Sequence, residues 1–154
     1  MNITYTNRVA LKWRELLTEA AHFYADKLGI DPQLQDKLTL SIFVRKGEDR
    51  GACLTKCYPM KTPTDFNIEL DPSEETCILQ TLAHEMVHVK QFATGELRLL
   101  NKGRAARWNN VPWKSKQDEM DSYYDSPWEI EAFGREVGLY LRFVTQYEGD
   151  MLNE

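Results

Sequence analysis

Residues 84–88, with the sequence His-Glu-Met-Val-His, constrain the fold and the chemistry of this chain more than any other stretch. They lie in a segment that the sequence predicts to be a helix. Residues 71–74 open it with Asp as a candidate N-cap, Pro at the first helical position and a Glu that can close a capping box. Gly95 is placed to end it. On a helix, the spacing of these side chains fixes which of them lie on the same side.

The helical spacing places the two histidines together. At about 100° per residue, His84 and His88 share one side of the helix, and Glu85 lies at its border. Two imidazoles four residues apart can bind one metal ion, while the adjacent Glu can hold a metal-bound water. This pattern predicts a hydrolytic zinc site; the alternative is an ordinary solvated helix face. The opposite, core-facing side carries Ile78, Leu79, Leu82, Ala83, Met86, Val87 and Val89.

A catalytic zinc site needs a third protein ligand. Residues 126–129, Ser-Pro-Trp-Glu, predict the start of a second helix that continues to about Tyr147. Glu129 lies within the apolar side of that helix, where a carboxylate is unfavourable unless something pairs with it. It is therefore the predicted third ligand. The apolar side is formed by Ile130, Phe133, Val137, Tyr140, Phe143, Val144 and Tyr147.

Alternatives to this ligand remain open at the level of sequence. Glu129 could instead cap the backbone amide of Ser126. Glu131 is the second choice as ligand, although it projects to the polar face, where Arg135 is placed to pair with it. Glu136 lies near the apolar side and is predicted to support the site rather than to bind the metal.

The two motifs, at residues 84–88 and 127–132, resemble those of small gluzincin metallopeptidases and of SprT-like domains in bacterial and phage proteins. In gluzincins the third ligand is a Glu on a later helix, commonly with Ala three residues after it, and Glu129 and Ala132 match that spacing. The chain departs from the pattern at Phe133, where many members carry Asp or Asn. The resemblance extends over residues 35–147. It implies a zincin-like fold and an enzyme that hydrolyses peptide or protein substrates.

The expected mechanism is metal-assisted hydrolysis of a peptide bond. Zn²⁺ held by the three predicted ligands polarises the scissile carbonyl, and Glu85 takes a proton from the attacking water and later delivers it to the leaving amine. Tyr124, just before the third-ligand helix, is the candidate donor to the developing oxyanion, with Tyr123 beside it. The alternative is that both tyrosines are loop aromatics packed on the core.

Length and composition favour one α+β domain over residues 1–154, because 42% hydrophobic content suffices for a sizeable core. An N-terminal helix is predicted over residues 7–28, followed by a small sheet of three to four strands. In zincin-like peptidases a strand near this position lies at the rim of the cleft, so residues 65–70 are a candidate substrate edge. The predicted strands cover residues 38–44, 52–58 and 66–70.

Residues 97–117, between the two metal helices, form a basic insert with no acidic residue. The turn signals at residues 101–103 and 109–110 predict an extended hairpin, with Trp108 and Trp113 packing beneath it. A flap that contacts an anionic polymer such as nucleic acid is one interpretation, and a solvated insert is the other. The basic residues are Arg98, Lys102, Arg104, Arg107, Lys114 and Lys116.

Charge and cysteine content bear on partners and compartment. A net charge of −5 argues against a generic nucleic-acid binder. The sequence has neither a signal peptide nor an apolar run long enough for a membrane span, which favours a cytoplasmic protein. Cys53, Cys57 and Cys77 are an odd set without disulfide spacing, as expected in a reducing compartment. A zinc-fold module that binds a partner with little or no catalysis is the remaining class of function.

Overall fold

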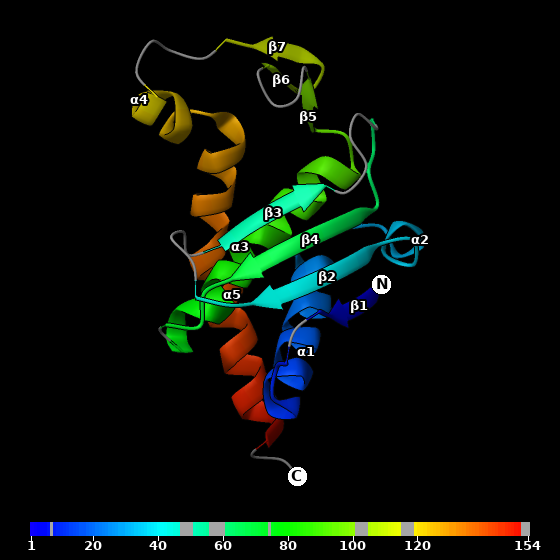
Figure 1. Ribbon diagram of the computed structural model, residues 1–154, viewed down its shortest axis with the longest axis vertical. Coiled ribbons are helices and arrows are strands. Elements are labelled where there is room, and N and C mark those ends of the chain that lie inside the picture. The colour runs from blue at the N-terminus through cyan, green and yellow to red at the C-terminus, as the bar shows by residue number, and fades with distance from the viewer. Residues whose placement is uncertain are drawn as a thin grey trace.

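A four-stranded sheet, a separate three-stranded sheet and five helices make up the described part of the chain (Figure 1). The computed structural model describes residues 1–6, 8–46, 51–55, 61–73, 75–100, 105–114 and 119–151. The architecture is α+β, as the sequence predicts. In chain order the elements are β1 (Asn2–Tyr5), α1 (Leu11–Lys27), α2 (Pro32–Gln35), β2 (Thr39–Val44), β3 (Gly51–Thr55), β4 (Asp65–Leu70), α3 (Glu75–Ala93), β5 (Leu97–Leu100), β6 (Ala105–Trp108), β7 (Val111–Trp113), α4 (Glu119–Tyr124) and α5 (Pro127–Met151).

The four-stranded sheet has the order β1-β2-β4-β3, with β3 antiparallel to β4 and the other pairs parallel. Strand β1, which the sequence analysis did not predict, adds an outer strand beside β2. The prediction that residues 65–70 form a free edge is wrong, because β4 is hydrogen-bonded to β2 on one side and to β3 on the other. Within the described residues, β3 has a partner on one side only.

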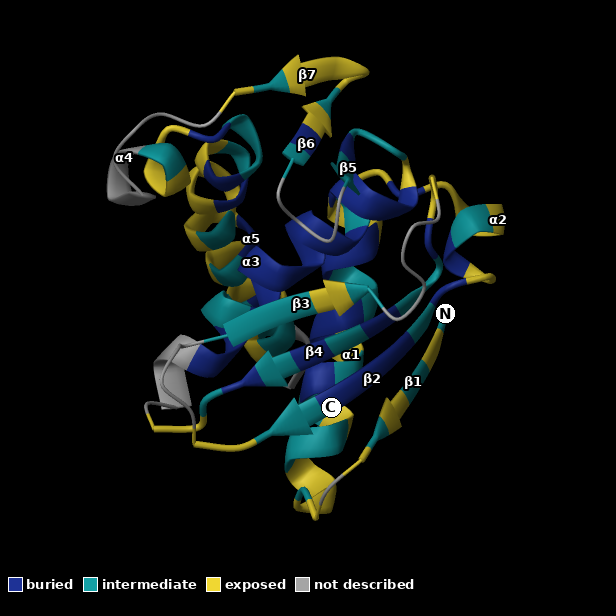
Figure 2. Ribbon diagram, turned by 45° about the horizontal axis from the view of Figure 1, so that its top comes forward, coloured by how far each residue is buried: buried dark blue, intermediate teal, exposed yellow. Residues whose placement is uncertain are grey.

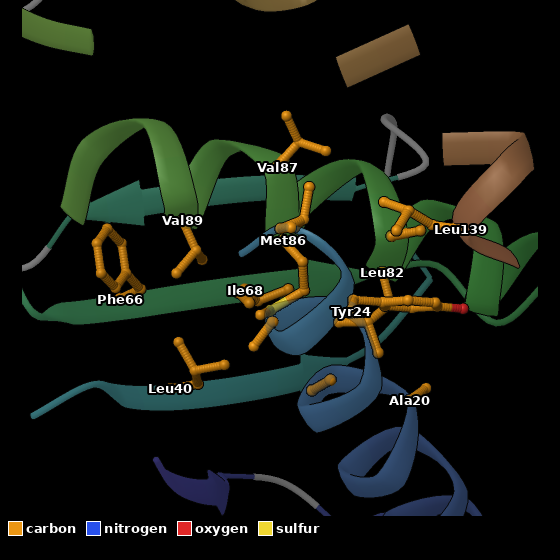
Figure 3. Packing of buried hydrophobic residues seen from close by; sticks show 14 of the residues in the cluster. Ala20, Tyr24, Leu40, Phe66, Ile68, Leu82, Met86, Val87, Val89 and Leu139 are labelled. Atoms are coloured by element: carbon orange, nitrogen blue, oxygen red, sulfur yellow. The ribbon is translucent and has the colours of Figure 1, made fainter. Parts of the chain in front are cut away.

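The main core lies between this sheet and helices α1 and α3 (Figures 1 and 2). Along β4 the side chains of Phe66, Ile68 and Leu70 are buried in alternation, as expected for a strand with one face against the core. Figure 3 shows Met86 of α3 over Ile68, beside Tyr24 of α1. The Tyr24 hydroxyl donates a hydrogen bond to the backbone oxygen of Leu79 at 3.1 Å, which joins α1 to α3.

Helices α3 and α5, which lie near the predicted site, begin and end only partly where the sequence predicts. Helix α3 begins at Glu75 instead of directly after Asp71, whose carboxylate accepts a hydrogen bond from the Ser73 amide at 2.8 Å. It ends before Gly95, which has a φ of 78° that favours glycine. Helix α5 begins at Pro127, as predicted, and continues beyond the predicted end at Tyr147.

The basic insert forms the antiparallel sheet β5-β6-β7. Asn109 and Asn110 connect β6 to β7 with φ values of 48° and 67°, the two positive angles of a type I′ turn. The ring centroids of Trp108 and Trp113 lie 6.4 and 5.7 Å from that of Trp128 in α5. The tryptophans therefore pack beneath the sheet, as the sequence predicts.

Helix α5 packs through only part of the side that the sequence predicts. Phe143 is buried, and Tyr140, Val144 and Tyr147 pack against the core. Ile130, Phe133 and Val137 were expected to face the core, but they are 57%, 43% and 47% exposed. The residues that face α3 or the core recur at alternating intervals of three and four: Glu129, Ala132, Glu136, Leu139 and Phe143. This stripe faces α3, which α5 crosses obliquely (Figure 1). No helix of the described residues is long and apolar enough to cross a membrane.

Candidate metal centre

Three buried side chains from α3 and α5 converge where the two helices pack together. The Nε2 atoms of His84 and His88 lie 3.2 Å apart. The Glu129 carboxylate faces both rings, with Oε2 3.3 Å from Nε2 of His84 and Oε1 3.4 Å from Nε2 of His88. All three residues are buried. Within the described residues they form a group whose ligand atoms could hold one metal ion.

The two alternatives to Glu129 as a ligand do not fit this geometry. The Ser126 amide donates to the Tyr123 carbonyl oxygen at 3.2 Å, so that Glu129 is not needed as its cap. Glu131 turns away and contacts Nζ of Lys90 at 3.0 Å and Nε of Arg135 at 3.2 Å, the latter being the predicted ion pair. Glu131 is therefore outside the group of possible ligands.

The far nitrogen of His84 is held by Glu136. Nδ1 of His84 lies 2.8 Å from Oε2 of Glu136, whose Oε1 accepts a hydrogen bond from Nε2 of Gln80 at 2.6 Å. An ionised carboxylate can only accept, so the Nδ1 position carries the proton and the Nε2 lone pair points into the site. Glu136 therefore supports His84 from outside the group of possible ligands, as the sequence analysis predicts.

His88 is oriented in the same way by Gln91. Its Nδ1 lies 2.8 Å from Oε1 of Gln91, and Nε2 of Gln91 donates to the backbone oxygen of Trp128 at 2.9 Å and to Oε2 of Glu131 at 3.1 Å. Gln91 is completely buried. Sequence reasoning missed it, although a glutamine three residues after His88 shares the same face of a helix and was a usable signal.

The geometry of the site suits a tetrahedral cation. Two nitrogens bound at roughly 2.0–2.1 Å to such an ion lie about 3.3 Å apart, close to the 3.2 Å between the two Nε2 atoms. Oε2 of Glu129 is buried and has no hydrogen-bond partner among the described residues. Two imidazoles and one carboxylate are also a donor set that several divalent transition metals accept. The residues present therefore fit a metal ion, whose identity the geometry leaves open.

The charges of Glu129, His84 and His88 strongly affect one another. Burial works to raise the pKa of Glu129, but the adjacent imidazoles outweigh it and lower the pKa to about 2. Burial disfavours the charged form of His84 and His88, yet the surrounding carboxylates, Glu129 first, raise the pKa of both rings. The pocket therefore favours positive charge beside Glu129, which a divalent ion would also supply.

Glu85 is a buried carboxylate next to this group and is only 4% exposed. Burial raises its pKa to about 7, because the attraction of the two histidines only partly offsets it. The adjacent strand approaches closely: a Cβ atom added to Gly51 would overlap Cγ2 of Thr81 and lie 2.7 Å from Oε1 of Glu85. A carboxyl group with a pKa near neutrality can both accept and return a proton.

The group opens into a cleft of about 650 Å³. Apart from the histidines, its ionisable lining includes the carboxylates of Glu85, Glu129 and Glu136 and no lysine or arginine among the described residues. An apolar wall is formed by α3, α5 and strand β5, through Phe92, Leu97, Leu99 and Trp128. The opposite wall is the start of β3, with Gly51, Ala52 and Cys53.

Aromatic side chains of α4 and α5 form the rim. Phe133 packs against His84 with ring centroids 4.7 Å apart, and Tyr124 packs on Phe133 at 5.8 Å. Tyr123 lies near Glu129: burial first, and then the charge of that carboxylate, raise the pKa of Tyr123. Both tyrosines line the cleft, but Tyr123 is the one beside a predicted ligand.

Other predicted features lie at or outside the site. Cys53 is a free thiol in the cleft wall, and burial raises its pKa well above the ordinary value, with Glu85 adding to the effect. Cys57 and the side chain of Cys77 lie outside the described residues. So do the basic residues Lys102, Arg104 and Lys116 of the insert.

Comparisons with protein-family models, with curated proteins and with solved structures find no match for this chain. What the site can do therefore has to follow from its own residues.

Proposed function

We propose that this chain is a zinc-dependent metallopeptidase of the gluzincin type. The observation that carries the proposal is the convergence of His84, His88 and Glu129 beside a fourth buried residue, the Glu85 carboxylate, inside an open cleft. A purely structural metal site is closed by four protein ligands, whereas a hydrolytic site combines three ligands with a base and an accessible position.

Three side chains would hold the ion. His84 and His88 would bind through Nε2, and Glu129 through its carboxylate, with Glu136 and Gln91 fixing the two rings. When bound, a zinc ion supplies a Lewis acid that polarises a carbonyl group and makes a nearby water more acidic. Two His and one Glu accept other divalent ions as well, so zinc is part of the proposal.

Glu85 is proposed as the general base. Its buried carboxylate, next to the proposed ligands, would take a proton from the attacking water and return it to the departing amine. Tyr123 and Tyr124 at the rim are proposed donors to the negative charge that develops on the carbonyl oxygen. Tyr123 is preferred because it lies beside Glu129, whereas Tyr124 packs on Phe133.

An extended peptide is the proposed substrate. Strand β3 lines the cleft, and one of its sides has no strand partner among the described residues, so that a substrate strand could add to it by backbone hydrogen bonds. The apolar wall formed by Phe92, Leu97 and Leu99 offers room for an uncharged side chain next to the scissile bond.

The base assignment is tested with Glu85→Gln. We expect this variant to keep its metal, because Glu85 is not a ligand, and to lose hydrolysis of a fluorogenic peptide library by at least a hundredfold. Metal content is measured on the same samples by elemental analysis. Hydrolysis at the wild-type rate with metal still bound would contradict the role of Glu85.

The ligand assignment is tested by metal content in protein purified without added metal. Glu129→Ala should lose the ion, whereas the matched variant Glu131→Ala should retain it, because Glu131 contacts Lys90 and Arg135 instead. Stoichiometric zinc in wild type and in Glu131→Ala is the expected result. No binding by wild type, even after reconstitution with Zn²⁺, would contradict the metal site itself.

A second candidate function is electrostatic contact with nucleic acid through the outer face of the insert. Arg98 and Arg107 lie directly opposite each other in β5 and β6, and no described residue forms an ion pair with either. Trp108 and Trp113 are turned inward, so contact would be with phosphates rather than by stacking on bases. Salt-dependent binding of single-stranded DNA that weakens in Arg107→Gln would support it; no binding at 50 mM salt would exclude it.

A further inference from the structure

Gln80 lies one helical turn before His84 on α3 and contacts the same residue of α5. Its Nε2 atom donates a hydrogen bond to Oε1 of Glu136 at 2.6 Å, while Nδ1 of His84 lies 2.8 Å from Oε2 of the same carboxylate. Residues four apart on a helix project to the same side, so both side chains reach across to α5 together. The two oxygens of Glu136 are thus held by two successive turns of α3.

The carboxylate of Glu136 depends on this second contact. Its side chain is only 15% exposed, so water satisfies little of its hydrogen-bonding capacity. No lysine or arginine among the described residues forms an ion pair with it. With Oε1 unpaired, rotation about the outer side-chain bonds would move Oε2 away from His84. Gln80 therefore fixes where the acceptor for His84 lies.

The support of His84 lacks the second anchor that is found at His88. There the acceptor is Gln91, whose Nε2 donates to two oxygens, at 2.9 and 3.1 Å, so that loss of one contact leaves the other. In the part of the chain that the structure describes, the contacts of the Glu136 carboxylate are with Gln80 and His84. The orientation of His84 therefore depends on a single residue behind its acceptor.

The chemical type of Gln80 suits this role. An amide N–H anchors a carboxylate without adding charge, so Glu136 keeps the negative charge that makes it a strong acceptor for an imidazole N–H. A lysine at this position would also donate, but it would bring a positive charge close to the group that is to hold a cation. Gln80 is half-buried and lines the cleft, so a substitution there need not disturb the core.

We propose that Gln80 is a positioning residue of the candidate metal site. By donating to Oε1 of Glu136 it places Oε2 on Nδ1 of His84, and this keeps the Nε2 lone pair of His84 directed at the group of possible ligands. The contacts from Gln80 through Glu136 to His84 are called the His84 network. Its consequence, tighter metal binding, rests on the proposed function, but the network itself can be measured on the imidazole ring of the metal-free protein.

The first measurement is the tautomer of His84 in the metal-free full chain, from long-range nitrogen–proton NMR spectra at a pH where the ring is neutral. Wild type should hold the proton on Nδ1 with an excess of roughly tenfold or more, because a charged acceptor stabilises that form. Gln80→Met keeps the side-chain length but removes the donor, and should lower this excess by about threefold or more. Gln80→Lys restores a donor and should keep the wild-type tautomer. Gln146→Met, at an exposed position of α5, is the matched control.

The second measurement is zinc affinity, by competition with a chromogenic chelator. Gln80→Met should weaken binding roughly 3- to 10-fold, less than the 10- to 100-fold typical for loss of a group that contacts a ligand directly. In a double-mutant cycle, the same substitution added to Glu136→Ala should change affinity by less than about twofold, because the network is already broken. Circular dichroism and denaturant unfolding of the metal-free variants check that each is folded.

The outcomes distinguish the His84 network from the metal site. A wild-type tautomer and wild-type affinity in Gln80→Met would overturn the inference. So would an equally large loss of affinity in the Glu136→Ala background, because Gln80 would then act by another route. A shifted tautomer in Gln80→Lys as well would exclude the donor as the cause. If wild type binds no zinc while His84 responds to Gln80→Met as expected, the network is supported and the proposed function is contradicted.

Discussion

At the scale of single residues, the candidate metal site depends on groups outside the three proposed ligands. Glu136 and Gln91 decide which nitrogen of each histidine is free, because each accepts a hydrogen bond from an Nδ1 atom. Gly51 decides how closely β3 can approach the Glu85 carboxylate. These three residues shape the chemistry through their neighbours, and each can be changed without removing a ligand.

Replacing Glu136 with Gln should weaken metal binding about 10- to 100-fold, because His84 loses a charged acceptor and is held less well in the binding tautomer. The measurement is a competition titration against a chromogenic chelator. Glu148→Gln is the control, since Glu148 is an exposed carboxylate farther along the same helix. Equal affinities of Glu136→Gln and wild type would show that the Nδ1 contact is unimportant.

Replacing Gly51 with Ala should destabilise the fold by about 1–3 kcal/mol, because the new methyl group would overlap Thr81 and the Glu85 carboxylate. Denaturant unfolding of the metal-free protein measures this change. Gly29→Ala is not a suitable control, because its φ of 71° brings strain of its own. Gly134→Ala, measured at low micromolar concentration, should instead stabilise the helix by about 1 kcal/mol. Equal stabilities of the two variants would contradict the close approach at Gly51.

At the scale of elements, the small sheet β5-β6-β7 is held over the cleft by three tryptophans. Its inner face carries Leu97 and Leu99, which line the cleft, and Trp108 and Trp113, which pack on Trp128. The outer face carries Arg98 and Arg107, because residues alternate between the two faces of a strand. One sheet thus combines an apolar wall of the cleft with a basic surface.

Truncation of Trp113 to Ala should loosen this sheet without emptying the metal site. Each aromatic pair contributes about 0.5–1.5 kcal/mol beyond its buried area, and Trp113 contacts Trp128 at 5.7 Å. We expect a loss of about 1–2 kcal/mol, with faster amide hydrogen exchange confined to β5, β6 and β7. Val111→Ala in the same strand, at a position that is 66% exposed, should change neither quantity. Uniformly faster exchange in all elements would argue against a separately docked sheet.

At the scale of the whole molecule, the proposed metal joins two helices that are far apart in sequence. Helix α3 would contribute two ligands, His84 and His88, and α5 the third, Glu129. An ion that binds the folded chain and not the unfolded one stabilises the fold by mass action. Metal content and global stability should therefore change together.

Removing the metal with a chelator should lower the melting temperature by roughly 5–10 °C. An ion at a free concentration of about 100 times its Kd adds about 2.7 kcal/mol to the free energy of unfolding. For a chain of this size, each kcal/mol raises the melting temperature by about 2–4 °C. Differential scanning calorimetry of loaded and chelated samples measures the shift. Glu129→Ala should show no such shift, whereas an equal shift in both proteins would place the ion elsewhere.

How far the sequence predicted the structure differs from element to element. Helical periodicity and the spacing of His84 and His88 predicted the two histidines of the site. The unfavourable burial of a carboxylate identified Glu129 as the third residue. The turn at Asn109 and Asn110 was predicted because its geometry is local. The prediction that residues 65–70 form a free edge was wrong, because the order of strands depends on which distant segments of the chain pair with each other.

The sequence by itself determined what depends on neighbours along the chain: the helix that carries His84 and His88, the hairpin turn and the α+β class. Only the tertiary structure decided what depends on contacts between distant segments. It placed Glu136 on His84 and left Ile130 and Val137 exposed, although their own helix predicted them on its buried side. The physical reason is that a helical pattern defines an apolar face about 100° or more wide, while the partner decides which part of that face is covered.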